Sequence, residues 1–255
     1  MSIKTIYTNG CSWTEGCGAE TAPENKNIQD ININDFAWPK YLGELMNCNV
    51  INEATGGGSN ARILRQTIDY VTALEPEQRA ETLIAIGWTL PDRDEIYIKG
   101  KYYRFNSAQP CSTFNDIKQN LTPKKVRQID DYYWHYFMDV YDPEAKLDIY
   151  FRQIYLLKNL LENLSIPFIF FLGMPWKWET PTTLNAEEEK RHGKIVAQIA
   201  SGTNGIDISA SMSYYMHEHK LPMSPCFHPW PKSHKIWADH IFQQLVDRKI
   251  VDPKI

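Results

Sequence analysis

The chain has 255 residues, of which 43% are apolar, so it can bury a sizeable core, and we expect one domain over residues 1–255. Its formal net charge of −4, without a long run of Lys or Arg, argues against nucleic acid as a partner. No apolar stretch reaches the roughly 18 residues needed to cross a membrane, so no membrane partner is expected. The five cysteines have no CxxC spacing, which favours a reducing compartment, and the sequence predicts a cytoplasmic protein.

Short apolar runs alternate with helical patterns along the chain. This alternation is typical of a mostly parallel sheet covered by helices on both faces. The candidate strands are residues 4–8, 50–52, 83–86, 168–172 and a weaker run near 205–208. The helical patterns are residues 36–46, 60–73, 148–164, 186–200 and 232–247. The sequence therefore predicts a three-layer α/β/α fold with a five-stranded sheet.

Residues 92–143 break this rhythm and are interpreted as an insertion after the third strand. The run DEIYIKGKYYRF predicts a β-hairpin that turns at Lys99 and Gly100, and DDYYWHYFMDVYD is strongly aromatic. Because the insertion follows a strand, we expect it to cover the ligand-binding end of the sheet, with at least two rings facing it. The alternative is a small satellite core of its own. The rings are Tyr97, Tyr102, Tyr103, Phe105, Tyr132, Tyr133, Trp134, Tyr136 and Phe137.

The loops that follow the strands carry the residues with chemistry. They read NGCSWTEG, EATGGGSNARI, GWTLPDR and GMPWKWETP, and CFHPWPKSH precedes the last helix. In open α/β sheets ligands bind at the carboxyl ends of the strands, so these loops are expected to meet. A serine hydroxyl is a poor nucleophile without a base, which pairs Ser12 with His228. His234 is interpreted as a helix-surface or supporting residue.

These loops resemble, in order, the four sequence blocks of the SGNH or GDSL-type hydrolases. Residues 10–14 stand where that family has Gly-Asp-Ser-Leu-Ser, and NEATGGGSNARI, IGWT and HPWPKSH resemble the second, third and histidine blocks. The resemblance implies a flavodoxin-like SGNH hydrolase fold and a serine nucleophile. It also implies that the Gly57 N–H contributes to the oxyanion hole, the set of donors that stabilises the negative oxygen formed during attack.

Three positions depart from the family pattern. Cys11 replaces the aspartate of the first block, and Thr89 replaces the oxyanion asparagine of the third. Pro225 stands where the family has an aspartate three residues before His228. No carboxylate is therefore placed by sequence to orient His228, and we expect a backbone carbonyl to take that role.

Further candidate residues surround this pair. For the oxyanion hole they are the Ser12 N–H, Gly57, Thr89 and Asn60, and a simpler interpretation of the glycines and Asn60 is a turn and a helix cap. For substrate binding they are Trp13, Trp88, Trp176, Trp230, Arg62 and Arg93, and the simpler interpretations are core packing for the tryptophans and surface ion pairs for the arginines. The HEH run at 217–219 matches neither HExxH nor a paired CxxC site, so neither metal nor cofactor is expected.

Two functions follow from these residues. The first is a serine esterase that uses a Ser-His dyad or incomplete triad on an ester-linked acyl group of a sugar-like or small polar substrate. The second is a catalytically weak or inactive binding module that keeps the fold. The sequence leaves the oligomeric state open.

Overall fold

A parallel sheet forms the centre of the protein. The structure, a computed structural model, describes residues 2–25, 30–107, 110, 113–174, 184–201 and 206–252. The sheet has five strands and every pairing is parallel. In spatial order they are β2 (Asn49–Asn52), β1 (Thr5–Asn9), β3 (Thr82–Trp88), β6 (Phe168–Leu172) and β7 (Ile206–Ser211). When only the strands of this sheet are counted in chain order, the spatial order is 2-1-3-4-5. This is the order of flavodoxin-like sheets, so the predicted fold class is confirmed. The expected start of the last strand, Gly205, lies outside the described residues.

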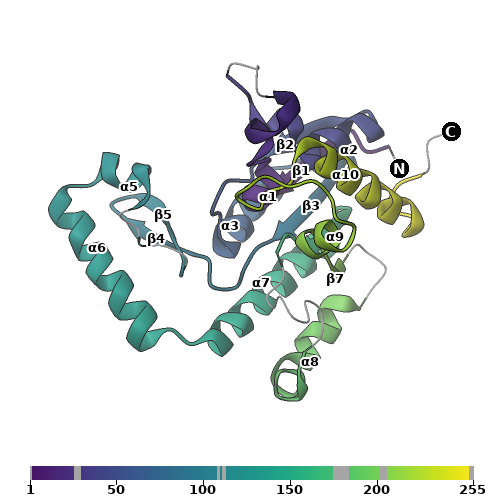
Figure 1. The fold of residues 1–255 in the computed structure, drawn as a ribbon. Coiled ribbons are helices and arrows are strands. Elements are labelled where there is room, and N and C mark those ends of the chain that lie inside the picture. Colours follow the sequence, from purple (N-terminus) through teal and green to yellow (C-terminus); the bar gives the residue numbers. More distant parts are fainter. Residues whose placement is uncertain are drawn as a thin grey trace.

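Helices cover both faces of this sheet. On one face lie α2 (Trp38–Met46), α9 (Met212–Glu218) and α10 (Pro231–Asp247), with α2 and α10 side by side (Figure 1). On the other face lie α3 (Asn60–Thr72), α7 (Pro143–Asn163) and α8 (Ala186–Ala200). No helix in the described ranges is long and apolar enough to cross a membrane.

Side chains of alternating strand residues enter the two helical layers. Ile6, Leu83, Ala85, Ile169 and Phe171 pack with α2, α9 and α10. Their strand neighbours Tyr7, Ile84, Ile86, Trp88, Phe168 and Phe170 pack with α3, α7 and α8. A strand buried on both faces reads as a continuous apolar run, as "TLIAIGW" of β3 does, which is why the pattern predicted a strand here.

One predicted helix starts earlier than expected. The periodic pattern predicts a start at residue 148, whereas α7 begins at Pro143. Asp142 caps the helix because its Oδ1 accepts the N–H of Glu144 at 2.9 Å, and a proline suits the first helical position, where no N–H is needed. Shorter helical turns are α1 (Ser12–Glu15), η1 (Ala19–Thr21), η2 (Pro23–Asn25), η3 (Ile33–Phe36) and α4 (Pro76–Arg79).

The insertion forms a separate group of elements beside the sheet (Figure 1). The predicted hairpin is confirmed as β4 (Asp94–Ile98) and β5 (Lys101–Phe105), and it is followed by α5 (Asn115–Asn120), α6 (Pro123–His135) and the π-helix η5 (Tyr136–Val140). Its aromatic rings pack mainly on one another around Phe105, and their recorded partners elsewhere are Arg65 and Lys146. The described contacts thus match the satellite core, and none of them joins these rings to Ser12.

His234 ties α10 to the start of α2. It is fully buried, and its Nδ1 accepts the Trp38 N–H at 3.2 Å. This position corrects the expectation of a helix-surface residue. The bond requires a neutral ring nitrogen, and burial lowers the pKa of His234 to about 3, with the nearby His228 adding to the shift.

We expect this burial to make the free energy of unfolding depend on pH. The unfolded imidazole titrates near 6.5, so below that pH the unfolded state binds a proton that the folded state refuses until about pH 3. Stability is therefore fully present above pH 6.5 and lost as the pH falls, by about 1.4 kcal/mol per pH unit for this one group. Urea unfolding between pH 8 and 5 measures the slope. In His234→Asn, the Asn Oδ1 can accept the same Trp38 N–H, and the slope of the free energy of unfolding against pH should fall by the contribution of about one proton. The exposed His217→Asn should leave that slope unchanged. An equal slope in all three proteins would contradict the prediction.

Candidate active site

Ser12 lies in a tight turn at the carboxyl end of β1. The strand ends at Asn9, and Gly10 and Cys11 lead into α1, whose first residue is Ser12. The Ser12 carbonyl accepts the N–H groups of Gly16 at 3.1 Å and Cys17 at 3.0 Å, which closes the turn. The whole residue is only 8% exposed, so the hydroxyl is held near the surface but sheltered from bulk water.

His228 lies in a closed loop just before α10. Ser224 clamps this loop, because its N–H donates to the His228 carbonyl at 2.8 Å and its Oγ accepts the His228 N–H at 3.0 Å. Phe227 inside the loop has a φ of +60°, a left-handed conformation that bulky residues rarely adopt. The two clamping bonds therefore hold a strained turn that directs the imidazole out of the loop.

The two side chains meet as the strand-end argument predicts. His228 Nε2 lies 2.9 Å from Ser12 Oγ. On the other side of the ring, Nδ1 lies 3.1 Å from the carbonyl oxygen of Cys226 and 3.3 Å from its Sγ. A carbonyl can only accept, so Nδ1 carries the proton in the neutral ring and Nε2 offers its lone pair to the Ser12 hydroxyl. A backbone carbonyl thus stands where an orienting carboxylate is absent.

Burial and nearby charges set the proton affinity of His228. Burial lowers the pKa of His228 below its ordinary value, because the charged ring is poorly solvated there. The Cys226 carbonyl and the carboxylates of Glu20 and Glu15 oppose this shift, whereas the Arg93 guanidinium adds to it. The ring is therefore neutral, and able to act as a base, at neutral pH.

The segment after α1 packs against the His228 loop. A methyl group on Gly18, whose φ is +93°, would lie 2.7 Å from His228 Cβ, so glycine permits this close approach. The Gly18 N–H donates to Glu20 Oε2 at 2.9 Å, which keeps that carboxylate beside the histidine loop. The Trp13 ring lies 6.3 Å from the imidazole and joins the core beneath it.

At the end of β3, Thr89 is fixed by two side chains. Asn60 Oδ1 accepts the Thr89 N–H at 3.0 Å, and its Nδ2 donates to the carbonyls of Thr89 and Leu90 at 3.2 and 2.9 Å. Because these bonds occupy its amide, Asn60 holds the loop and is not an oxyanion donor, which corrects that expectation. Arg93 Nη1 donates to Thr89 Oγ1 at 2.9 Å, so Arg93 belongs to this edge of the site.

Two of the predicted binding residues, Trp88 and Arg62, have structural roles. Trp88 is fully buried against the rings of Tyr150 and Phe170, so it is core and not a substrate contact. Arg62 donates to the Glu53 carbonyl at 2.8 Å and to Asn9 Oδ1 at 3.3 Å, which ties the second loop to β1.

Trp230 lies in the histidine loop itself. Its Nε1 donates to Thr21 Oγ1 at 3.2 Å, and Thr21 in turn donates to the Gly18 carbonyl at 2.7 Å. This pair of bonds joins the loop to the segment after α1. Trp176 lies outside the described residues.

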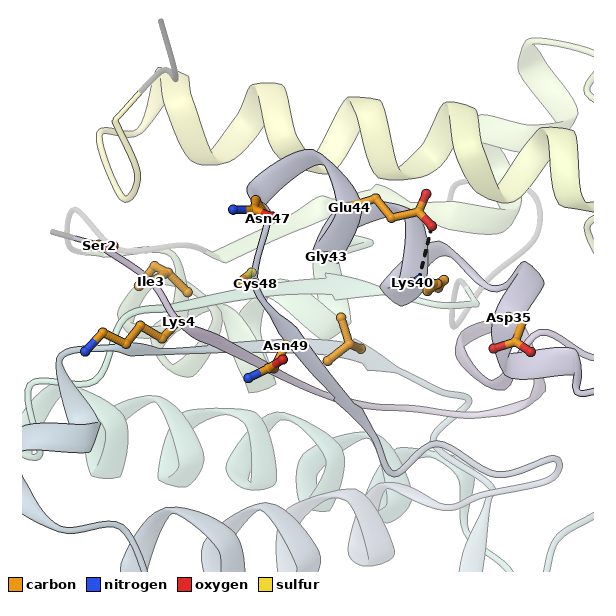
Figure 2. Close-up of a pocket in the computed structure, with 11 residues that line it drawn as sticks. Ser2, Ile3, Lys4, Asp35, Lys40, Gly43, Glu44, Asn47, Cys48 and Asn49 are labelled. Atoms are coloured by element: carbon orange, nitrogen blue, oxygen red, sulfur yellow. Dashed lines mark ion pairs between the residues drawn. The ribbon is translucent and has the colours of Figure 1, made fainter.

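Two cavities lie near the sheet, at opposite ends. One of about 330 Å³ lies between α3 and the hairpin, and Thr55, Ser59, Arg62 and Arg104 are among its lining residues. A larger one of about 780 Å³ is lined by residues that precede β1 and β2, with the Lys40–Glu44 ion pair at its rim (Figure 2). Because it lies at the amino ends of these strands, it is remote from Ser12. The smaller cavity lies beside the glycine loop, with Thr55 and Ser59 in its lining.

A doubly wound parallel sheet with a serine–histidine pair at its carboxyl edge defines an α/β protein of flavodoxin-like architecture. The chain belongs to DUF6071, described as a family of unknown function, whose model matches residues 23–253. The match begins after Ser12. No curated protein matches the chain.

Several solved structures are similar to this chain over nearly its whole length. An acetylxylan esterase from Geobacillus stearothermophilus is 14% identical with a TM-score of 0.49, and the alignment covers 96% of each chain. The psychrotrophic esterase EstA from a Pseudoalteromonas species is 12% identical with a TM-score of 0.47, covering 97% of this chain and 100% of that one. A lipolytic protein of the G-D-S-L family from Veillonella parvula is 12% identical with a TM-score of 0.45, covering 94% and 97%.

Sequence reasoning missed several residues of this site. Ser224, which clamps the His228 loop, and Gly18, which packs against it, lie in turns without a recognisable motif. Glu20 and Arg104 reach the site from segments that resemble no family block. Glu15, three residues after Ser12, lies in the first loop but was not singled out there.

Proposed function

We propose that this protein is a serine esterase that hydrolyses an ester-linked acyl group on a small polar or sugar-like molecule. The observation that carries the proposal is the 2.9 Å contact between Ser12 Oγ and His228 Nε2, with Nδ1 held by the Cys226 carbonyl. This geometry gives the nucleophile its base in the correct tautomer.

The reaction would proceed in two halves. Ser12 Oγ attacks the acyl carbon while its proton moves to His228 Nε2, and the negative oxygen accepts hydrogen bonds from the Ser12 and Gly57 N–H groups and the Thr89 hydroxyl. The carbonyl re-forms as the C–O bond to the alcohol breaks, and His228 gives the alcohol its proton. Water, deprotonated by His228, then attacks the acyl-enzyme. As the bond from the acyl carbon to Ser12 Oγ breaks, His228 returns the proton to Ser12 and the acid is released.

The polar groups around the pair support a small, hydroxylated substrate. Arg93 lies at the end of β3, where its guanidinium donates to Thr89 Oγ1, and the carboxylates of Glu15 and Glu20 lie near His228. Charged and hydrogen-bonding groups at the edge of the site suit a small polar molecule. Trp13 is only 4% exposed and packs in the core, which corrects its expected role as a substrate contact.

A fluorophosphonate probe tests the proposal. We expect it to label the protein at Ser12, as located by mass spectrometry of the labelled peptide, and to fail with Ser12→Ala. The exposed Ser201→Ala serves as the matched control and should label like the wild type. A folded wild-type protein that takes no label would contradict the proposal and favour the binding module, which the uncharged partners of His228 Nδ1 also support.

A further inference from the structure

The glycine loop after β2 is enclosed between Ser12 and the insertion. A methyl group on Gly56 would lie 4.0 Å from Ser12 Cβ and 3.1 Å from Glu15 Oε2. A methyl group on the next residue, Gly57, would instead lie 3.1 Å from Arg104 Cδ. One side of the loop therefore faces the nucleophile, and the other faces β5 of the hairpin.

Arg104 holds the loop by its backbone. Its Nη1 donates to the Gly56 carbonyl at 2.7 Å, a short bond from a charged donor. The guanidinium also lies 4.3 Å from the centre of the Phe114 ring, which limits its movement. The Gly56 carbonyl is thus directed toward the insertion.

The planarity of the peptide bond fixes what the neighbouring N–H does. The described peptides are all trans, so the Gly56 carbonyl and the Gly57 N–H, which share one plane, point in opposite directions. With the carbonyl on the Arg104 side, the N–H is directed to the Ser12 side. Among the described residues no acceptor is recorded for this N–H. A φ of +69° at Gly57 allows the chain to continue from this orientation.

The position of Arg104 is itself secured from α3. Glu95 of β4 lies opposite Arg104 of β5 in the antiparallel register of the hairpin. Both carboxylate oxygens of Glu95 accept hydrogen bonds from the Arg65 guanidinium, each at 3.0 Å. The Arg65 guanidinium also lies 4.0 Å from the centre of the Tyr102 ring. Because α3 begins directly after the glycine loop, the hairpin and the loop are fixed to the same helix.

We propose that Arg104 is a positioning residue that orients the Gly56–Gly57 peptide, so that the Gly57 N–H completes the oxyanion hole. This inference rests on the proposed esterase function. It gives the insertion a part in catalysis that its aromatic rings do not supply: the hairpin aligns a backbone donor belonging to a different segment of the chain.

Kinetics of Arg104→Met on a small ester test this role. Loss of one oxyanion donor costs on the order of 10²–10³ in kcat, and a peptide that is merely free to rotate should cost about 10–100-fold. We expect this loss in kcat with KM and the pH dependence of kcat/KM unchanged, since Arg104 acts through the Gly56 carbonyl and no contact joins it to His228 among the described residues. Lys101→Met, on the same strand, is the matched control. The kcat of Arg104→Lys, which keeps a charged donor, should lie between those of Arg104→Met and Lys101→Met.

Three results would overturn the inference. These are wild-type kcat in Arg104→Met, a rise in KM alone, or a loss in Arg104→Met that is matched by Lys101→Met. If Arg104→Met does not fold, wild-type kcat in Arg104→Gln, which is uncharged and too short to reach the Gly56 carbonyl in the same way, does the same. Failure of the esterase function is seen separately, because the probe would then not label Ser12 in the wild type.

Discussion

Replacing His228 with alanine is expected to lower kcat on a small ester by about 10⁴. Loss of the histidine from a complete triad costs on the order of 10⁶, and loss of the aspartate alone about 10⁴. A histidine that has lost its aspartate therefore still contributes on the order of 10², and an intact one about 10⁶. Here the Cys226 carbonyl keeps the correct tautomer but carries no charge, so the contribution of His228 should lie between these two limits. Steady-state hydrolysis of a chromogenic acetate ester measures it, with the exposed His217→Ala as control. A loss under tenfold would show that another base serves Ser12.

The same assay across pH identifies the base. His228 must be neutral to accept the Ser12 proton, and burial lowers the pKa of His228 below 6.5. We therefore expect wild-type kcat/KM to be constant at neutral pH and to fall on the acid side, with its midpoint below pH 6.5. A midpoint above 6.5 would show that the neighbouring carboxylates outweigh burial in setting the pKa of His228.

Introducing the absent carboxylate should increase activity. Cys226 Sγ lies 3.3 Å from His228 Nδ1, so an aspartate at this position can bring an oxygen within reach of the ring proton. The charge would stabilise the imidazolium formed during attack, and we expect Cys226→Asp to raise kcat by about 10–100-fold, a part of the 10⁴ attributed to such a carboxylate. It should also raise the pKa of His228 and shift the acid limb to higher pH.

Cys226→Asn is the matched control for this gain. It has nearly the shape of aspartate without the charge, so it should leave kcat close to wild type. An unchanged rate in Cys226→Asp would mean that the carbonyl already orients the imidazole fully and that charge adds nothing. An equal gain in both variants would assign the effect to removal of the thiol.

Sequence patterns were sufficient where local periodicity determines structure. The strands β3 and β6 are buried and mostly apolar on both faces, and β1 is buried from Ile6 onward. The serine and histidine follow from the rule that strand ends meet. The alternation along β3 also shows why Trp88 is not a substrate contact. Ile84, Ile86 and Trp88 share one face of the strand, and that face is buried in the core. The position of Trp88 at the strand end alone suggested a substrate contact.

The rest depends on contacts between distant segments. The aromatic run at residues 130–142 contains the last turns of α6 and the whole of η5. Four of its rings pack on Phe105 of the hairpin, namely Tyr132, Tyr133, Tyr136 and Phe137. Nothing local to that aromatic run shows its partner. Arg104 likewise acts through a carbonyl 48 residues away, and a bond to backbone leaves no complementary side chain that a sequence pattern could reveal.

The separation of Ser12 and His228 has a consequence for biosynthesis. His228 follows Ser12 by 216 residues, and its loop is braced by α10, which packs against α2 from the first part of the chain. A ribosome therefore releases the nucleophile long before the base, at about 5–20 residues per second, tens of seconds earlier in slow translation. During that interval the nascent chain carries an unactivated alcohol. On the proposed function, Ser12 becomes an activated nucleophile only once the His228 loop has folded against it.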